Sequence, residues 1–325
     1  MPTSLGLPSL TWQNSFNNSV AASGTALTDN RTILLGIKNA LIGFASNPWI
    51  VKGSSNSVAG AMDGVDRWSG ISNLVWANAG TAHSWIVLEQ GGVYTSGGNK
   101  FQICIECANV SATGNLLTVS ISNSAGYTGG SATNKPTATD EYVYSSATWL
   151  TGGTGSIGPI IYNVQQSTTG EATRVFCFYN SINILFWSFE KLTDAETGVT
   201  YPISTVVAGG TTTTNQATWT LLSSNTNGKA RPVATNLAAW YSVSGSLGQG
   251  SGQVQTAANI YSSKWPAYIA RSTVTGGHFI GKFQDCYFTS TGRNNGDAVP
   301  SGGTKVWTVV GNLLLPTGGT TLVVS

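Results

Sequence analysis

Hydrophobic and polar positions alternate along most of the chain, and one stretch alone has the longer period of a helix. That stretch is LTDNRTILLGIKNALIGFASNPW, and its apolar positions recur at spacings of three and four residues: Ile33, Ile37, Leu41 and Phe44. Thr28 or Asp29 can cap its start, and Pro48 follows its end. The pattern therefore predicts one amphipathic helix over about residues 29–45.

The remaining apolar runs are short, alternating or β-branched, and bounded by Gly, Ser, Thr and Asn, which predicts strands. They lie at 73–77, 83–90, 101–110, 115–122, 158–166, 172–179, 183–192, 217–224, 237–244, 277–288, 304–315 and 320–325. The turn-like NAGT predicts a hairpin between the first two runs, and the short turns STTGE and NSI predict a meander over 158–192. Residues 1–26 are polar and turn-like.

Composition strengthens the β assignment. The chain has 325 residues, of which 41% are hydrophobic and 40 are Gly, which suits turns better than helix interiors. We expect a mostly β protein, an antiparallel sandwich or jelly-roll-like fold with one N-terminal amphipathic helix. One large domain over 1–325 is favoured, with an N-terminal arm and helix over 1–50. The alternative is a subdivision near the polar loop at 207–216.

Charged residues make up only 9% of the chain, where about 25% is usual. The net charge of +2 has no basic run, so nucleic-acid binding is not expected. No run approaches the ~20 apolar residues that a membrane helix needs. The start MPTSLGLPSLTWQ has no basic residue or continuous apolar region, so no secretory signal is expected. A protein that has a low-charge surface and is synthesised in a host cytoplasm, without a secretory signal, is typical of virion components.

The stretch DGVDRW places two carboxylates close together, at Asp63 and Asp66, beside Arg67 and Trp68. It is not a calcium loop, because apolar residues occupy its third and twelfth positions. A pair of carboxylates for sugar hydrolysis is an alternative, but almost any loop could supply one. We favour a structural loop, in which Asp-Gly makes a turn, an Asp accepts backbone N–H groups and Trp68 anchors the loop on the core.

Cys104 and Cys107 form a C-x-x-C pair, which can bind zinc or carry redox chemistry. Here they lie in the strand-like FQICIEC, where residues three apart point to opposite faces. Cys177 and Cys286 also lie in strand-like runs. Four buried thiols are therefore expected, and no metal or other cofactor.

The chain has two histidines. His83 precedes Ser84, but neighbours on a strand face opposite ways, so they are not expected to form a base and nucleophile. His278 begins an apolar strand. A triad assembled from distant residues stays open, but there is no G-x-S-x-G elbow and no phosphate-binding loop.

The chain also has eleven tryptophans. Trp76, Trp85 and Trp187 lie in strand patterns and are expected in the core. Four others lie in polar surroundings and are the candidates to face a ligand or a partner subunit: Trp12, Trp149, Trp240 and Trp265.

Several stretches together resemble a structural protein of tailed-bacteriophage virions. They are DGVDRW, LVWA, HSWIVLEQ, FQICIE, GGSATNKPTATDE, QQSTTGEATRVFCF and FWSFEKL, together with GKFQDCYF and GDAVPSGGTKVWTVVGNLLLPTGG near the C-terminus. The likeness spans roughly residues 26–320. The resemblance implies a non-enzymatic subunit present in many copies, whose partners are itself and other virion proteins. It does not select among head, neck, tail and baseplate. The alternatives are a receptor- or glycan-binding module of a tail fibre or baseplate, for a host surface glycan, and a polysaccharide depolymerase.

Overall fold

A computed structural model describes the chain in eighteen segments. They are residues 10–20, 26–76, 81–91, 102–110, 116–124, 126–137, 142–145, 149–151, 160–179, 183–193, 200–208, 219–224, 230–236, 265–271, 278–288, 298–299, 307–310 and 313–316. Within these ranges the chain forms nineteen strands, one α-helix and one short 3-10 helix, η1 (Ile71–Asn73). The prediction of a mostly β protein with antiparallel sheets and one N-terminal helix is confirmed. No helix of the described segments is long and apolar enough to cross a membrane.

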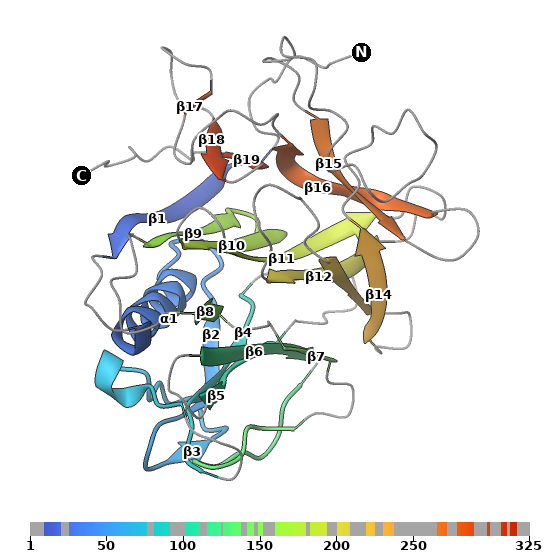
Figure 1. The fold of residues 1–325 in the computed structure, drawn as a ribbon. Helices are drawn as coiled ribbons and strands as arrows, with labels where there is room; N and C mark the ends of the chain where they lie inside the picture. The colour runs from blue at the N-terminus through green and yellow to red at the C-terminus, as the bar shows by residue number, and fades with distance from the viewer. Residues whose placement is uncertain are drawn as a thin grey trace.

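The larger sheet has twelve antiparallel strands, and most neighbours in it are also consecutive in the chain (Figure 1). In spatial order they are β1 (Trp12–Val20), β9 (Ile160–Ser167), β10 (Ala172–Tyr179), β11 (Asn183–Thr193), β12 (Thr200–Ala208), β13 (Trp219–Ser224), β14 (Ala230–Asn236), β15 (Trp265–Arg271), β16 (His278–Phe288), β19 (Leu313–Pro316), β18 (Trp307–Val310) and β17 (Ala298–Val299).

The smaller sheet has seven strands. In spatial order they are β3 (Gly60–Ala61), β2 (Ile50–Ser55), β4 (Trp85–Glu89), β5 (Gln102–Val110), β6 (Leu116–Ser124) and β7 (Tyr142–Ser145), and β8 (Trp149–Thr151) also pairs with β6. Each pair is antiparallel.

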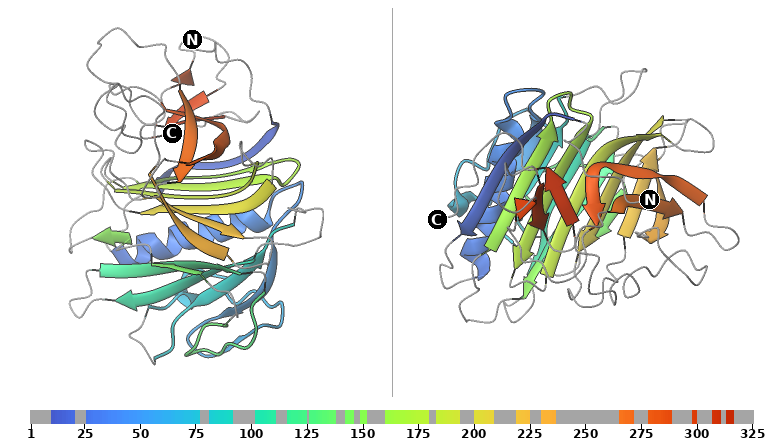
Figure 2. Two further views of the ribbon diagram at one scale, coloured as in Figure 1. Left: turned by 90° about the vertical axis from the view of Figure 1, so that its right-hand side faces the viewer. Right: turned by 90° about the horizontal axis from the view of Figure 1, so that it is seen from above.

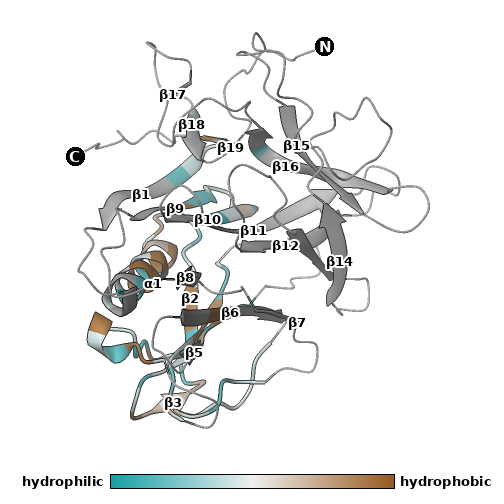
Figure 3. Ribbon diagram, viewed as in Figure 1, coloured by the Kyte–Doolittle hydropathy of each residue, from teal (hydrophilic) through white to brown (hydrophobic). Residues whose placement is uncertain are grey.

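Helix α1 (Ala26–Ile42) lies between the two sheets (Figure 2). Its buried apolar residues meet residues from both sheets in one core: Ile33, Leu34, Ile37 and Leu41 from the helix, Ile86, Leu88, Ile103 and Ile105 from the smaller sheet, and Tyr162, Val164 and Val175 from the larger. Figure 3 shows apolar residues on α1 and on neighbouring strands of the smaller sheet. Gly36 allows close packing, because a Cβ there would collide with the phenol of Tyr162. The helix thus buries apolar surface against two layers.

Several sequence predictions are confirmed. The helix exists, although it begins at Ala26 and ends at Ile42 rather than spanning 29–45. The meander over 158–192 is present as β9, β10 and β11, which pair in sequence order. The runs 101–110 and 115–122 pair as β5 and β6.

The predicted hairpin between 73–77 and 83–90 is wrong. β4 pairs with β2 and β5 instead, and residues 74–76 form no strand. Polar contacts explain the difference: Val75 donates its N–H to Ser84 Oγ (2.9 Å), and Ser84 Oγ donates to the Asn73 carbonyl (3.0 Å). A side chain takes bonds that a strand ladder would otherwise make.

Two further expectations need correction. Residues 12–20, predicted as turn-like, form β1, because pairing with β9 stabilises a strand whose polar sequence has no apolar alternation. The run 304–315, predicted as one strand, contains the two paired strands β18 and β19. The candidates at 237–244 and 320–325 lie outside the described residues. β12 and β13, on either side of the loop near 207–216, pair with each other.

Candidate functional site

The first carboxylate of DGVDRW closes a local turn. Asp63 Oδ1 accepts the Val65 N–H (3.1 Å), and both Asp63 oxygens accept from the Arg67 guanidinium (2.9 and 2.6 Å). Arg67, and then the Val65 N–H, hold the pKa of Asp63 well below its usual range, and the same contact raises the pKa of Arg67. The Arg67 N–H also donates to Ser54 Oγ (2.7 Å), which attaches the loop to β2.

The second carboxylate turns the other way, toward the helix. Asp66 Oδ1 accepts the Trp68 N–H (2.9 Å), and Asp66 Oδ2 accepts from Lys38 Nζ of α1 (2.6 Å). Lys38 Nζ also donates to the Trp68 carbonyl (2.9 Å). The Trp68 ring is fully buried, and its indole N–H donates to the Ser55 carbonyl of β2 (3.1 Å). The loop therefore joins α1 to the smaller sheet.

The two carboxylates have different cationic partners. Asp63 is held by Arg67 at the surface, while Asp66 is held by Lys38, whose side chain is only 4% exposed. Each carboxylate oxygen already has a partner within the chain. The geometry of DGVDRW, including the buried Trp68, is that of a loop anchor.

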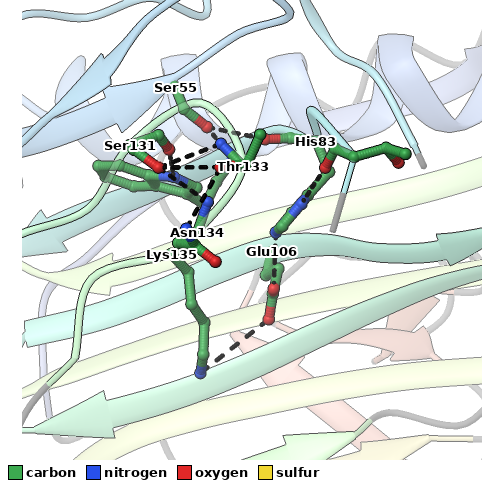
Figure 4. A network of polar contacts seen from close by, with 9 residues as sticks. Ser55, His83, Glu106, Ser131, Thr133, Asn134 and Lys135 are labelled. Carbon is green, nitrogen blue, oxygen red and sulfur yellow. Dashed lines mark hydrogen bonds and ion pairs between the residues drawn. The ribbon is translucent and has the colours of Figure 1, made fainter. Parts of the chain in front are cut away.

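A second polar cluster surrounds His83, just before β4 (Figure 4). His83 Nε2 lies 2.8 Å from Glu106 Oε1 on β5, and His83 Nδ1 lies 3.1 Å from the Thr81 carbonyl. Lys135 Nζ lies 4.0 Å from the other oxygen of Glu106. Both ring nitrogens thus face acceptors, which favours the doubly protonated imidazolium.

His83 and Glu106 form a hydrogen-bonded pair that becomes an ion pair when the imidazole is protonated. The hydrogen bond to Glu106 raises the pKa of His83, against the effect of partial burial. Ser84 Oγ bonds to Asn73 and Val75, whereas the His83 ring bonds to Thr81 and Glu106. His83 and Ser84 therefore have separate structural partners.

The segment over residues 126–137 is fastened to this cluster. The backbone N–H of His83 donates to the Ala132 carbonyl (3.1 Å), and the Trp85 indole N–H donates to the Ser131 carbonyl (2.8 Å). Gly130 has a φ of +95° and lies against the Trp85 ring, where a side chain would collide. Lys135 adds the ionic contact to Glu106. Charge and backbone bonds together hold this segment to the smaller sheet.

A third cluster lies on the larger sheet, on the side away from α1. Trp12 is only 5% exposed, and its indole N–H donates to Asp285 Oδ2 (2.9 Å). The buried Arg174 guanidinium stacks on the Trp12 ring, 4.4 Å from its centre, and donates to the Asp285 carbonyl (3.4 Å). The Leu10 N–H donates to the same carboxylate oxygen (2.8 Å). These contacts join β1, β10 and β16.

Trp12 is therefore an interior anchor, and Arg174 covers one face of its ring. Trp149 begins β8 and Trp265 begins β15, while Trp240 lies outside the described residues. Trp85 is fully buried and Trp76 packs against the core, as predicted.

The C-x-x-C cysteines lie on opposite faces of β5, as the strand pattern predicts. Cys107 belongs to the core between the sheets, and Cys104 packs with Trp85 and Tyr127 on the other face. Both are free thiols, and burial raises the pKa of Cys107 well above its usual value. Among the described residues, no three His, Cys, Asp or Glu side chains gather as a metal site.

Sequence reasoning missed the partners that complete these clusters. One signal was available for Lys38: it follows Leu34 by four residues, so a charge lies on the helix face that the apolar residues bury. Glu106, Arg174 and Asp285 lie inside strand patterns and have no comparable signal. Comparison of the chain with protein-family models, with curated proteins and with solved structures gives no match.

Proposed function

We propose that the chain is a non-enzymatic structural subunit of a tailed-phage virion, assembled in many copies through β-rich interfaces. The observation that supports the proposal is that the charged side chains of the three clusters make their contacts inside the fold. In the described part of the chain, the charged side chains of all three clusters contact one another or the backbone within the fold: Lys38, Asp63, Asp66, Arg67, His83, Glu106, Lys135, Arg174 and Asp285. These residues serve the fold itself.

The scarcity of charge favours association between copies. The whole chain has 15 basic and 13 acidic residues, so copies repel one another weakly. Contacts between subunits then depend on neutral polar groups, apolar side chains and strand edges rather than on salt bridges. The resemblance to tailed-phage virion proteins agrees with this physical reasoning.

We also propose that the two sheets and the intervening helix form a sandwich-like fold. Their strand order favours a sandwich over a jelly roll, because most neighbours in each sheet are consecutive in the chain, whereas a jelly roll needs Greek-key connections. Among the described edge strands of the two sheets, β1 is long enough to offer an extended row of backbone groups for assembly.

Quantitative mass spectrometry of purified phage particles tests the function. In particles whose genome encodes this chain, we expect its peptides at many copies per particle, retained after washing in high salt. Its absence from particles, with the protein left in the lysate supernatant, would refute the proposal. Binding on a glycan array, or release of oligosaccharides from host polysaccharide, would instead favour a receptor-binding module or a depolymerase.

A further inference from the structure

The ends of the two sheets differ in length. The larger sheet ends at β1, with nine residues, and at β17, with two. The smaller sheet ends at β3, with two residues, and at β7, with four. Very short edge strands are one of the ways in which proteins prevent unwanted pairing. Three edges are blunted in this way, and β1 is the exception.

The sequence of β1 lacks the charged residues and proline that protect many edge strands. Its residues, WQNSFNNSV, include no Lys, Arg, Asp, Glu or Pro. Charged residues and Pro on an edge strand normally oppose pairing with another chain. Its register with β9 is regular from Trp12 to Asn17, and irregular only beyond that point. β1 therefore offers a regular stretch of backbone, from Trp12 to Asn17, that a further strand can join.

The hydrogen bonds to β9 indicate which backbone groups of β1 face outward. The Thr168 N–H donates to the Thr11 carbonyl (2.9 Å), and these two residues continue the register that pairs Trp12 with Ser167. In an antiparallel ladder, bonded and non-bonded pairs alternate. Thr11 and Gln13 thus direct their backbone groups toward β9, whereas Trp12 and Asn14 direct theirs toward the open edge.

The start of β1 is held firmly in place. Trp12 is fixed by Asp285 and Arg174 on one face of the sheet. Gln13 is fixed on the other face, where it accepts the Ser46 N–H (3.0 Å) and donates to the Ser46 carbonyl (3.1 Å). Among the described residues, β1 has β9 as its only strand neighbour (Figure 2). An edge already fixed in an extended conformation loses little further entropy when it pairs.

We propose that β1 pairs antiparallel with β1 of a second copy, so that the two larger sheets join across a two-fold axis. A two-fold contact places the same strand on both sides. This strand suits such a contact, because it has no charges to repel its own copy. The inference rests on the proposed function, since it names the surface through which that subunit contacts itself.

The variant Asn14→Pro tests the contact. Proline removes an N–H that faces away from β9, so the intramolecular ladder with β9 remains. The control Asn14→Ala removes the side chain but keeps the N–H. By sedimentation velocity with the full chain, we expect the wild type and Asn14→Ala to form dimers or even-numbered oligomers. For Asn14→Pro we expect a dissociation constant at least tenfold higher, with an unchanged circular dichroism spectrum.

A second variant covers the case in which Asn14→Pro does not fold. Asn14→Lys keeps the N–H and adds like charges at the contact, so we expect a weaker dimer that recovers as salt screens the charges. A folded Asn14→Pro or Asn14→Lys protein that associates like the wild type would overturn the β1 contact. In that case the proposed function would still stand if the wild-type chain were found in many copies per particle. Absence of the wild-type chain from particles would refute the function, whatever the state of β1.

Discussion

The ionic contact between Lys38 and Asp66 allows the sharpest prediction about stability. In Asp66→Ala, the Lys38 ammonium loses its partner at 2.6 Å while its side chain stays 4% exposed, and the Trp68 N–H loses its acceptor at 2.9 Å. A charge-assisted bond contributes about 1.5–3 kcal/mol, and loss of a partner from a fully buried pair costs about 3–5 kcal/mol. Asp66 is 30% exposed, so solvent screening places the expected loss at about 2–3 kcal/mol.

Thermal unfolding followed by circular dichroism measures this loss. An unfolding entropy of about 2.1 cal/mol/K per residue gives roughly 0.7 kcal/mol/K for 325 residues. The expected loss therefore lowers Tm by about 3–4 °C. The matched control is Asp63→Ala, which removes the exposed carboxylate of the same loop. It is expected to have a smaller effect, part of which disappears in high salt.

The double variant Lys38→Met, Asp66→Ala separates the ion pair from the loop itself. Removing both charges avoids an uncompensated buried ammonium, so we expect it to be more stable than Asp66→Ala alone. An Asp66→Ala protein that melts like the wild type, or an Asp63→Ala protein with the lower Tm of the two, would refute the stabilising role of the Lys38–Asp66 contact. Loss of a hydrolytic activity from either variant, with the fold intact, would contradict the structural role of the loop.

Three further predictions concern the helix contact, the histidine cluster and a buried thiol. Gly36→Ala is expected to lower Tm, because overpacking against Tyr162 costs about 1–3 kcal/mol and exceeds the gain in helix propensity of about 1 kcal/mol. The control Gly126→Ala has open space around the new Cβ and is expected to leave Tm unchanged. The pKa of His83 is raised above 6.5, so protonated His83 stabilises the folded state fully below pH 6.5, and this stabilisation is lost as the pH rises through the folded-state pKa. Urea unfolding at several pH values should show this loss of stability. The variant His83→Gln should abolish the pH dependence. Cys107 is expected to resist a thiol reagent until the protein unfolds, and rapid labelling in native buffer would contradict its burial.

The sequence predicted the elements that have a clear period or composition. The helical spacing of Ile33, Ile37 and Leu41 located α1, because these residues all face the core. The alternation in FQICIEC located β5 and also placed Cys104 and Cys107 on opposite faces. In both cases, burial of one face produces a pattern that the sequence itself displays.

The sequence did not predict elements that depend on distant partners. The strand β1 is polar, and its partner β9 lies more than a hundred residues away in the chain. The clusters joining Lys38 to Asp66 and Trp12 to Asp285 likewise depend on tertiary packing. The anchoring role of DGVDRW followed from local turn chemistry, whereas its partner on α1 did not.

Self-association of the wild-type protein can be measured directly in solution. Mass photometry and sedimentation velocity give its molar mass over a range of concentrations. We expect an oligomer with an even number of subunits, whose mass is a multiple of the 33.8 kDa of one chain. A single species of 33.8 kDa at every concentration, and in particular one that turns over a polysaccharide, would contradict it.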